Sequence, residues 1–158
     1  MQRDEWTFDG SVEITVNLFS MHTFYTMLGQ NVTEIEWLRG QEQQITEYFD
    51  STQSYDLWKK RCGVGLYTFA LLIKHFGWEA LYTFLKNYED DIVNGASTLP
   101  KDNQEKIDQW VIRYSNIINY NIKNYFSMFG LPVSDNIDEQ LLGFESLSID
   151  PNPQDFFD

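Results

Sequence analysis

The chain has 158 residues, which fits one domain and is long enough to bury a substantial core. Its composition, 42% hydrophobic and 16% aromatic, is that of a globular protein and excludes a disordered one. Eleven basic residues against 24 acidic ones leave a formal net charge of -13, which repels nucleic acid and anionic membranes, so neither is an expected partner. We also expect no membrane insertion, because no uninterrupted apolar run approaches the length that spans a bilayer.

An ordered polar arm is expected at 1–10, followed by a nearly all-apolar helix from 11 to 28. Glu13, Asn17 and Ser20 recur along this helix at spacings of four and three, so they form one polar line on an otherwise buried helix. Burying a carboxylate costs free energy unless a cation or hydrogen bonds compensate its charge. Two interpretations of Glu13 follow: its carboxylate accepts hydrogen bonds from neighbouring amides near the positive helix end, or it is a zinc ligand. The residues alone favour the first interpretation.

The next segment, to residue 49, is polar and helical, and Gly40 is expected to split it. Thr33 and Glu36 have the spacing of a capping box. The most hydrophobic stretch, 64–76, predicts a central helix that Gly77 ends. Glycines near its start predict a bend or the close approach of another helix, at Gly63 and Gly65.

Later segments repeat apolar residues at three- and four-residue spacing, which predicts further helices. No strand-type alternation is long enough to support a sheet, so the expected fold class is all-α, a compact multi-helix subdomain. We expect this subdomain to cover 11–143, with an acidic tail at 144–158 that is weakly ordered or packs as extended chain. The further helices are expected at 78–88, 103–118, 122–129 and 134–142.

The residues show little recognisable chemistry. The two histidines, His22 and His75, are far apart, and neither begins the two-histidine helical zinc motif. Phosphate loops, serine-nucleophile elbows and dinucleotide fingerprints are absent. The single cysteine, Cys62, excludes an internal disulfide and is interpreted as a small core hydrophobe near a helix boundary.

Several stretches in order nevertheless resemble one family, the enhancin-like and mucin-degrading zinc metallopeptidases (the M60 peptidase family), with their relatives the TRP-channel-associated factors. The resemblance spans roughly 6–142. It is carried by WTFDGSVEITVNLFS at 6–20, HFGWEA at 75–80, LPKDN at 99–103, QWV with YS at 109–115, and NI, YF and FGLPVS at 121–134.

The resemblance implies a gluzincin-type zinc site, built from an H-E-x-x-H helix and a glutamate a short distance downstream. That glutamate matches Glu13, and Asn17 and Ser20 are the residues expected to support it. The two histidines and the catalytic glutamate would lie just before residue 1. We therefore expect the chain to be the C-terminal helical half of such a domain, with zinc in the complete domain, no cofactor in this chain alone, and no catalysis without the histidines.

Two functions stay open. The first is part of a zinc metallopeptidase domain whose substrate is a protein or glycoprotein of the mucin type. The alternative is a non-catalytic module that binds a protein partner, as the channel-associated relatives suggest. If the chain is part of a larger catalytic domain, the side of the first helix around Glu13, with some nearby apolar side chains, is expected to be uncovered except where the arm at 1–10 reaches it.

Overall fold

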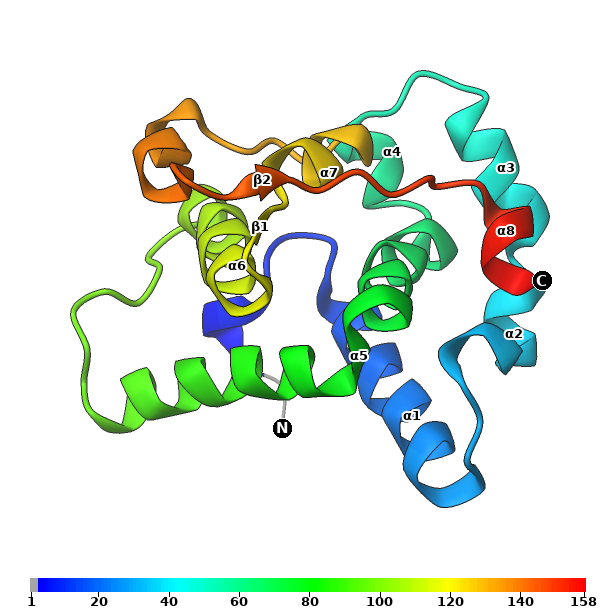
Figure 1. Ribbon diagram of the computed structural model, residues 1–158, viewed down its shortest axis with the longest axis horizontal. Helices are drawn as coiled ribbons and strands as arrows, with labels where there is room; N and C mark the ends of the chain where they lie inside the picture. The colour runs from blue at the N-terminus through cyan, green and yellow to red at the C-terminus, as the bar shows by residue number, and fades with distance from the viewer. Residues whose placement is uncertain (1–2) are drawn as a thin grey trace.

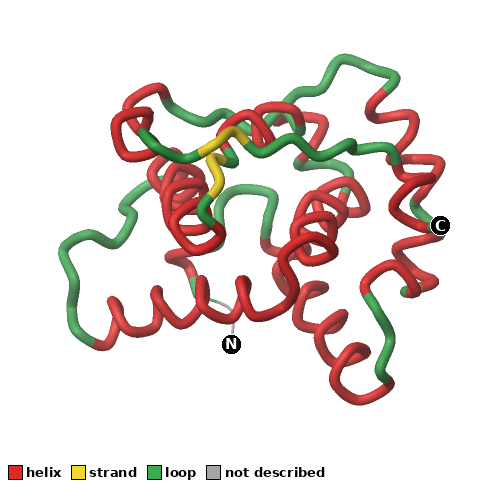
Figure 2. Tube along the Cα trace, in the orientation of Figure 1, coloured by secondary structure: helices red, strands yellow, loops and turns green. Residues whose placement is uncertain are grey.

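The computed structural model describes residues 3–158 and is built almost entirely of helices, so the predicted all-α class is confirmed (Figures 1 and 2). Over these residues the only sheet is one parallel pair of two-residue strands, β1 (Tyr120–Asn121) and β2 (Glu145–Ser146). Residues 1–2 of the expected arm lie outside the described residues, and its remainder contains the short 3-10 helix η1 (Asp4–Trp6).

The other elements follow in chain order. The α-helices are α1 (Val12–Leu28), α2 (Glu36–Arg39), α3 (Glu42–Phe49), α4 (Tyr55–Trp58), α5 (Cys62–Val93), α6 (Asn103–Ile118), α7 (Lys123–Met128) and α8 (Pro153–Phe157). Two further 3-10 helices are η2 (Val32–Glu34) and η3 (Asp135–Leu141).

The prediction of a capping box at Thr33 and Glu36 was wrong, because the box lies two residues earlier, at Asn31 and Glu34. Asn31 is the capping residue, and its backbone N–H donates to the Glu34 carboxylate over 2.7 Å. The chain makes a 3-10 turn, η2, before α2 begins, and this extra turn moves the cap toward the N-terminus. Gly40 does separate α2 from α3, as predicted.

Helix α5 is long and bent. Gly77 has φ 77° and ψ 172°, which no helix contains, so it divides α5 into the two runs that the sequence predicted. Figure 1 shows the first run nearly end-on and the second crossing the lower part of the molecule. Both runs are longer than expected: the first begins at Cys62 and the second ends at Val93.

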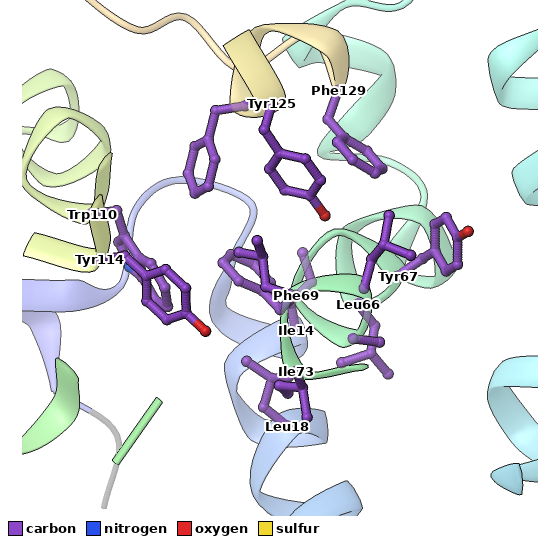
Figure 3. Close-up of a cluster of buried hydrophobic side chains, with 14 of the residues drawn as sticks. Ile14, Leu18, Leu66, Tyr67, Phe69, Ile73, Trp110, Tyr114, Tyr125 and Phe129 are labelled. Carbon is purple, nitrogen blue, oxygen red and sulfur yellow. The ribbon is translucent and has the colours of Figure 1, made fainter. Parts of the chain in front are cut away.

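The core forms where α1, α5, α6 and α7 meet (Figure 3). Gly65 of α5 lets α1 approach closely, because a Cβ at this position would lie 2.8 Å from Ile14 Cγ1 and nearer still to Ile14 Cδ1. The prediction of close helix approach is therefore confirmed at Gly65. Figure 3 shows the side chains that converge here, from Ile14 and Leu18 of α1 to Phe69 of α5 and Trp110 of α6.

The C-terminal tail runs as extended chain across the molecule and ends in α8, a helix that the sequence did not predict (Figure 1). Phe156 and Phe157 of α8 are buried, and the Phe156 ring lies 5.0 Å from that of Tyr67. The Tyr67 hydroxyl donates to the Pro151 carbonyl over 3.0 Å. Two buried aromatic rings thus attach the tail to α5.

Candidate functional site

Glu13 lies in the first turn of α1, and its side chain is exposed. The expectation that this helix is buried around most of its circumference was wrong. Its buried apolar residues, Ile14, Leu18 and Met21, follow one side, whereas the exposed fractions of Val12 and Val16 are 53% and 47%. The carboxylate therefore faces solvent, and it makes no hydrogen bond or ion pair with any residue from 3 to 158.

Exposed apolar side chains beside an exposed carboxylate match the uncovered side that we expected for α1. The amide bonds proposed for Glu13 on the ordinary interpretation are not seen within the described residues.

Asn17, one turn further along α1, is half-buried and connects this face to α5. Its Nδ2 donates to the sulfur of Cys62 over 3.6 Å. Burial raises the pKa of the Cys62 thiol, and the nearby Glu13 carboxylate raises it further. The hydrogen bond from Asn17 lowers this pKa, but by less than burial raises it. Cys62 thus belongs to the candidate site, which the sequence analysis missed because the contact joins residues 45 positions apart.

Ser20 also lies on this side of α1 and is exposed, but its hydroxyl donates to the Val16 carbonyl of its own helix over 3.4 Å. The structure therefore brings Glu13, Asn17 and Cys62 together, and it leaves the Ser20 hydroxyl bonded to backbone.

The loop before Glu13 is held by a network that sequence reasoning did not detect. The Asp9 N–H donates to Asn103 Oδ1 over 2.5 Å, and the Tyr55 hydroxyl donates to the Asp9 carbonyl over 2.6 Å. Lys59 forms an ion pair with the Asp9 carboxylate at 3.1 Å and lies against Gly10, whose φ is +83°. These contacts anchor the start of α1 to α4 and α6.

Neither histidine adds a ligand beside Glu13. His22 follows nine residues later, which is about 13 Å along a helix and half a turn around it. His75 lies on α5, where burial lowers its pKa. Throughout 3–158, no group of three or more His, Cys, Asp and Glu residues is arranged to hold a metal ion. The described chain thus offers Glu13 as one open oxygen donor, and a zinc site would need further ligands from outside it.

Comparison with known proteins identifies one family. The family model described as peptidase M60, enhancin and enhancin-like, matches residues 1–130. No solved structure matches the chain. Within the described residues, no helix has the length and apolar character needed to cross a membrane.

Curated relatives match most of this chain but extend far beyond it. A TRPM8 channel-associated factor homolog from Danio rerio is 25% identical over 157 residues, which cover 97% of this chain and 16% of the relative. TRPM8 channel-associated factor 2 from Bos taurus is 26% identical over 144 residues, 89% of this chain and 15% of the relative. TRPM8 channel-associated factor 1 from Homo sapiens is 25% identical over 136 residues, which cover 84% of this chain and 14% of the relative. The chain thus spans about 15% of the length of these relatives.

Proposed function

The chain belongs to the peptidase M60 (enhancin and enhancin-like) family, and from this we propose that it forms the C-terminal helical part of a zinc metallopeptidase domain. In this proposal Glu13 is the third protein ligand of the zinc ion, beside two histidines of an H-E-x-x-H helix that precedes the described residues. The observation that carries the proposal is the Glu13 carboxylate itself. It is exposed, has no partner among residues 3–158, and lies within the matched segment on an uncovered side of α1.

The chain's own residues suit this role. The chemistry that a zinc ion supplies in such a site is a water nucleophile near neutral pH, and it requires three protein ligands. Glu13 contributes one carboxylate oxygen without first having to break an ion pair with any residue from 3 to 158. Asn17 donates its N–H to Cys62, so its Oδ1 can accept a hydrogen bond from a ligand imidazole and fix the orientation of that ring. Ser20 is a second supporting residue in the proposal.

The anchored loop explains how Glu13 would be held. A metal ligand must stay within a fraction of an ångström of its productive position. Asp9 is bonded to Asn103, Tyr55 and Lys59, so the backbone four residues before Glu13 is tied to two other helices. The substrate in this proposal is a protein, and by the family resemblance a glycosylated, mucin-like one.

Zinc binding tests the proposal directly. Calorimetry on the 158-residue chain should show no submicromolar zinc binding, because one carboxylate is too few ligands. Joining an H-E-x-x-H helix in frame ahead of residue 1 should create a tight site and peptidase activity on a mucin-type glycoprotein. Glu13→Ala should then weaken zinc binding by more than the roughly 10–100-fold typical of losing an outer-shell partner, and should abolish cleavage.

Glu36→Ala is the matched control, because Glu36 is also an exposed carboxylate in the first turn of a helix. It should leave both zinc affinity and cleavage unchanged. Full cleavage by the Glu13→Ala protein would refute the ligand assignment, and tight zinc binding to the chain alone would show that its site lies elsewhere.

The alternative is a non-catalytic module that binds a protein partner. Two observations favour it: the relatives found are named for association with a channel, and the end of α1 exposes Met27 and Leu28 by 77% and 65%. The transcript upstream of residue 1 distinguishes the two functions. An in-frame H-E-x-x-H there supports the peptidase, and a longer reading frame without it supports the interaction module.

A further inference from the structure

A cavity of about 210 Å³ opens between α1 and the second run of α5 and reaches inward to η1 and α6. Its floor consists of buried side chains, three indole rings and two leucines: Trp6, Leu18, Trp78, Leu81 and Trp110. A cavity lined in this way holds water poorly and accepts apolar molecules.

Three polar side chains of the lining offer a ligand no free donor. Thr15 Oγ1 donates to the Ser11 carbonyl over 2.8 Å, and Trp110 Nε1 donates to the Trp6 carbonyl over 2.7 Å. Trp6 Nε1 is enclosed by protein and cannot be reached from the cavity. A polar group placed among these side chains would lose its hydration with little hydrogen bonding in return, so the part of a ligand that fills the floor is apolar.

Accessible polar groups lie at the mouth of the cavity. The side chains there, Phe19 and His22 from α1 with Tyr82 and Leu85 from α5, are half-buried. His22 Nε2 and the Tyr82 hydroxyl are hydrogen-bonded to each other. Because a hydroxyl can donate one hydrogen bond and also accept, Tyr82 keeps a free position for a ligand whichever of the two groups donates.

This cavity is separate from the candidate zinc site. An α-helix turns about 100° per residue, so Thr15, Leu18 and His22 of α1 lie roughly 140–200° around the axis from Glu13. The lining of the cavity is therefore on the side of α1 opposite to the carboxylate. An inference about it does not rest on the proposed function.

We propose that this cavity binds a small uncharged amphiphile, with an apolar body of about eight carbons on the floor and a hydroxyl group at the mouth beside Tyr82. The volume sets the size of the body. A cavity of about 150 Å³ holds benzene, which is roughly 25 Å³ for each carbon, so a cavity of about 210 Å³ holds about eight carbons.

The polar group of the ligand is uncharged, because the cavity compensates neither sign of charge. Among the described residues, no Asp, Glu, Lys or Arg lines it, so an ammonium group would gain no ion pair there. Burial and the nearby Glu79 carboxylate both raise the pKa of the Tyr82 hydroxyl. A carboxylate at the mouth would therefore meet a like charge, on a chain whose formal net charge is already -13.

A series of linear alcohols tests the size of the site. In calorimetric titrations of the 158-residue chain from butan-1-ol to dodecan-1-ol, each added CH₂ group should tighten binding about fourfold until the floor is full. The gain should stop near octan-1-ol, because further carbons have no apolar surface left to cover. A site for the long acyl chain of a lipid would not show this limit.

The tryptophans report where the alcohols bind. In ¹H–¹⁵N spectra, the indole signals of Trp6, Trp78 and Trp110, assigned with single Trp→Phe variants, should shift saturably with octan-1-ol because their rings line the cavity. Trp37 and Trp58 do not line it, so their indole signals serve as internal controls.

Variants of Leu85 should move the size limit in both directions. Leu85→Ala removes about three carbons from the mouth and Leu85→Phe adds about three, so the limit should move to about eleven and about five carbons. Leu142→Phe is the matched control, because Leu142 is 78% exposed and outside the cavity, and it should leave the limit unchanged. If Leu85→Phe does not fold, Leu85→Ala still tests the size.

A double variant tests the polar group. Replacing both His22 and Tyr82 by Phe keeps two rings at the mouth and removes their polar atoms. Octan-1-ol should then bind about fivefold more weakly, the worth of one net hydrogen bond, whereas toluene, which has no polar group, should bind the parent and the variant equally.

Other outcomes would overturn the proposal. These are no saturable shift with any alcohol, affinity that still rises fourfold per carbon up to dodecan-1-ol, a limit that Leu85→Ala does not move, or shifts of the Trp37 and Trp58 signals as large as those of the cavity indoles. Tighter binding of octanoate or octylammonium than of octan-1-ol would assign the mouth to a charged group instead.

Discussion

Gly65→Ala tests the contact that joins the two central helices. Gly65 lies on α5 where α1 crosses it, and an added Cβ would lie 2.8 Å from Ile14 Cγ1, nearer to Ile14 Cδ1, and 3.4 Å from Trp58 Cζ2. Ile14 is 1% exposed and Trp58 is 0% exposed, so neither side chain has free space into which it could move. The methyl group can be accommodated only if α1 shifts away from α5.

Two opposing terms set the magnitude. Alanine favours a helix interior over glycine by about 1 kcal/mol. Overpacking a filled core costs about 1–3 kcal/mol. Because this contact is too close for small adjustments, we expect the upper part of that range and a net loss of about 1–2 kcal/mol in the free energy of unfolding. In a domain of this length, each kcal/mol corresponds to a fall of roughly 2–4 °C in the melting temperature.

Urea unfolding of a double-mutant cycle provides the assay. Ile14→Val removes the Cδ1 methyl and should cost about 0.5–1.5 kcal/mol in the parent chain. In the Gly65→Ala background the same change creates the needed space, so its cost should fall by about 1 kcal/mol. Gly40→Ala is the control, because the nearest atom to its added Cβ is 3.4 Å away and its φ is −62°; it should be neutral or stabilising.

Additive losses in the cycle would refute this reasoning, because they would show that the two side chains do not compete for space. A Gly65→Ala chain as stable as the parent would do the same, since α1 and α5 would then be packed less tightly than the structure shows.

Three further predictions concern the bend, the tail and an ion pair. Gly77→Ala should lower the free energy of unfolding by about 1–3 kcal/mol in thermal unfolding, because alanine is strained at φ 77°. No atom lies within 4 Å of the added Cβ, so backbone strain is the only cost, and an unchanged stability would mean that the bend relaxes. Phe156→Ala should cost about 3–5 kcal/mol in urea unfolding, because the ring is 1% exposed, whereas a loss below about 1 kcal/mol would show that the tail does not support the core. Arg3 hydrogen-bonds Glu89 and holds the pKa of that carboxyl below its ordinary value of 4.5, so the pair stabilises the fold above pH 4.5 and this stabilisation is lost as the pH falls through the lowered pKa. The difference in urea midpoint between the parent and Glu89→Gln should therefore narrow from pH 7 to pH 3, and a pH-independent difference would contradict the assignment.

Local signals explain why several helices could be predicted closely. Asp102 caps α6 by accepting a hydrogen bond from the Glu105 N–H over 2.9 Å, and its apolar residues repeat at helical spacing. Gly29 ends α1 in the left-handed conformation at φ 69°. In both cases the deciding interactions join residues within a few positions of one another, so the sequence contains them directly.

Features that the sequence analysis did not predict depend on a distant or a competing contact. Ser11 stands at the N-cap of α1, yet its hydroxyl donates to the Phe8 carbonyl over 2.7 Å instead of accepting from the helix. Helix α8 forms at the C-terminus because Lys74 donates to the carbonyls of Asp155 and Phe156 while the aromatic rings of the tail are buried. The Lys74 contacts join residues 81 and 82 positions apart, so no local pattern in the sequence indicates them.

The sequence by itself determined the all-α class, the breaks at Gly40 and Gly77, and the family to which the chain belongs. The helices and their breaks depend on backbone preferences that act over a few residues. The family depends on the order of residues along the chain, which the sequence contains directly. Only the tertiary structure decided which side of α1 is open, that Cys62 meets Asn17, and that Trp6 is buried with an unpaired N–H. The reason is physical: burial and pairing depend on what packs against a residue, and the Trp6 carbonyl finds its donor on Trp110, 104 residues away.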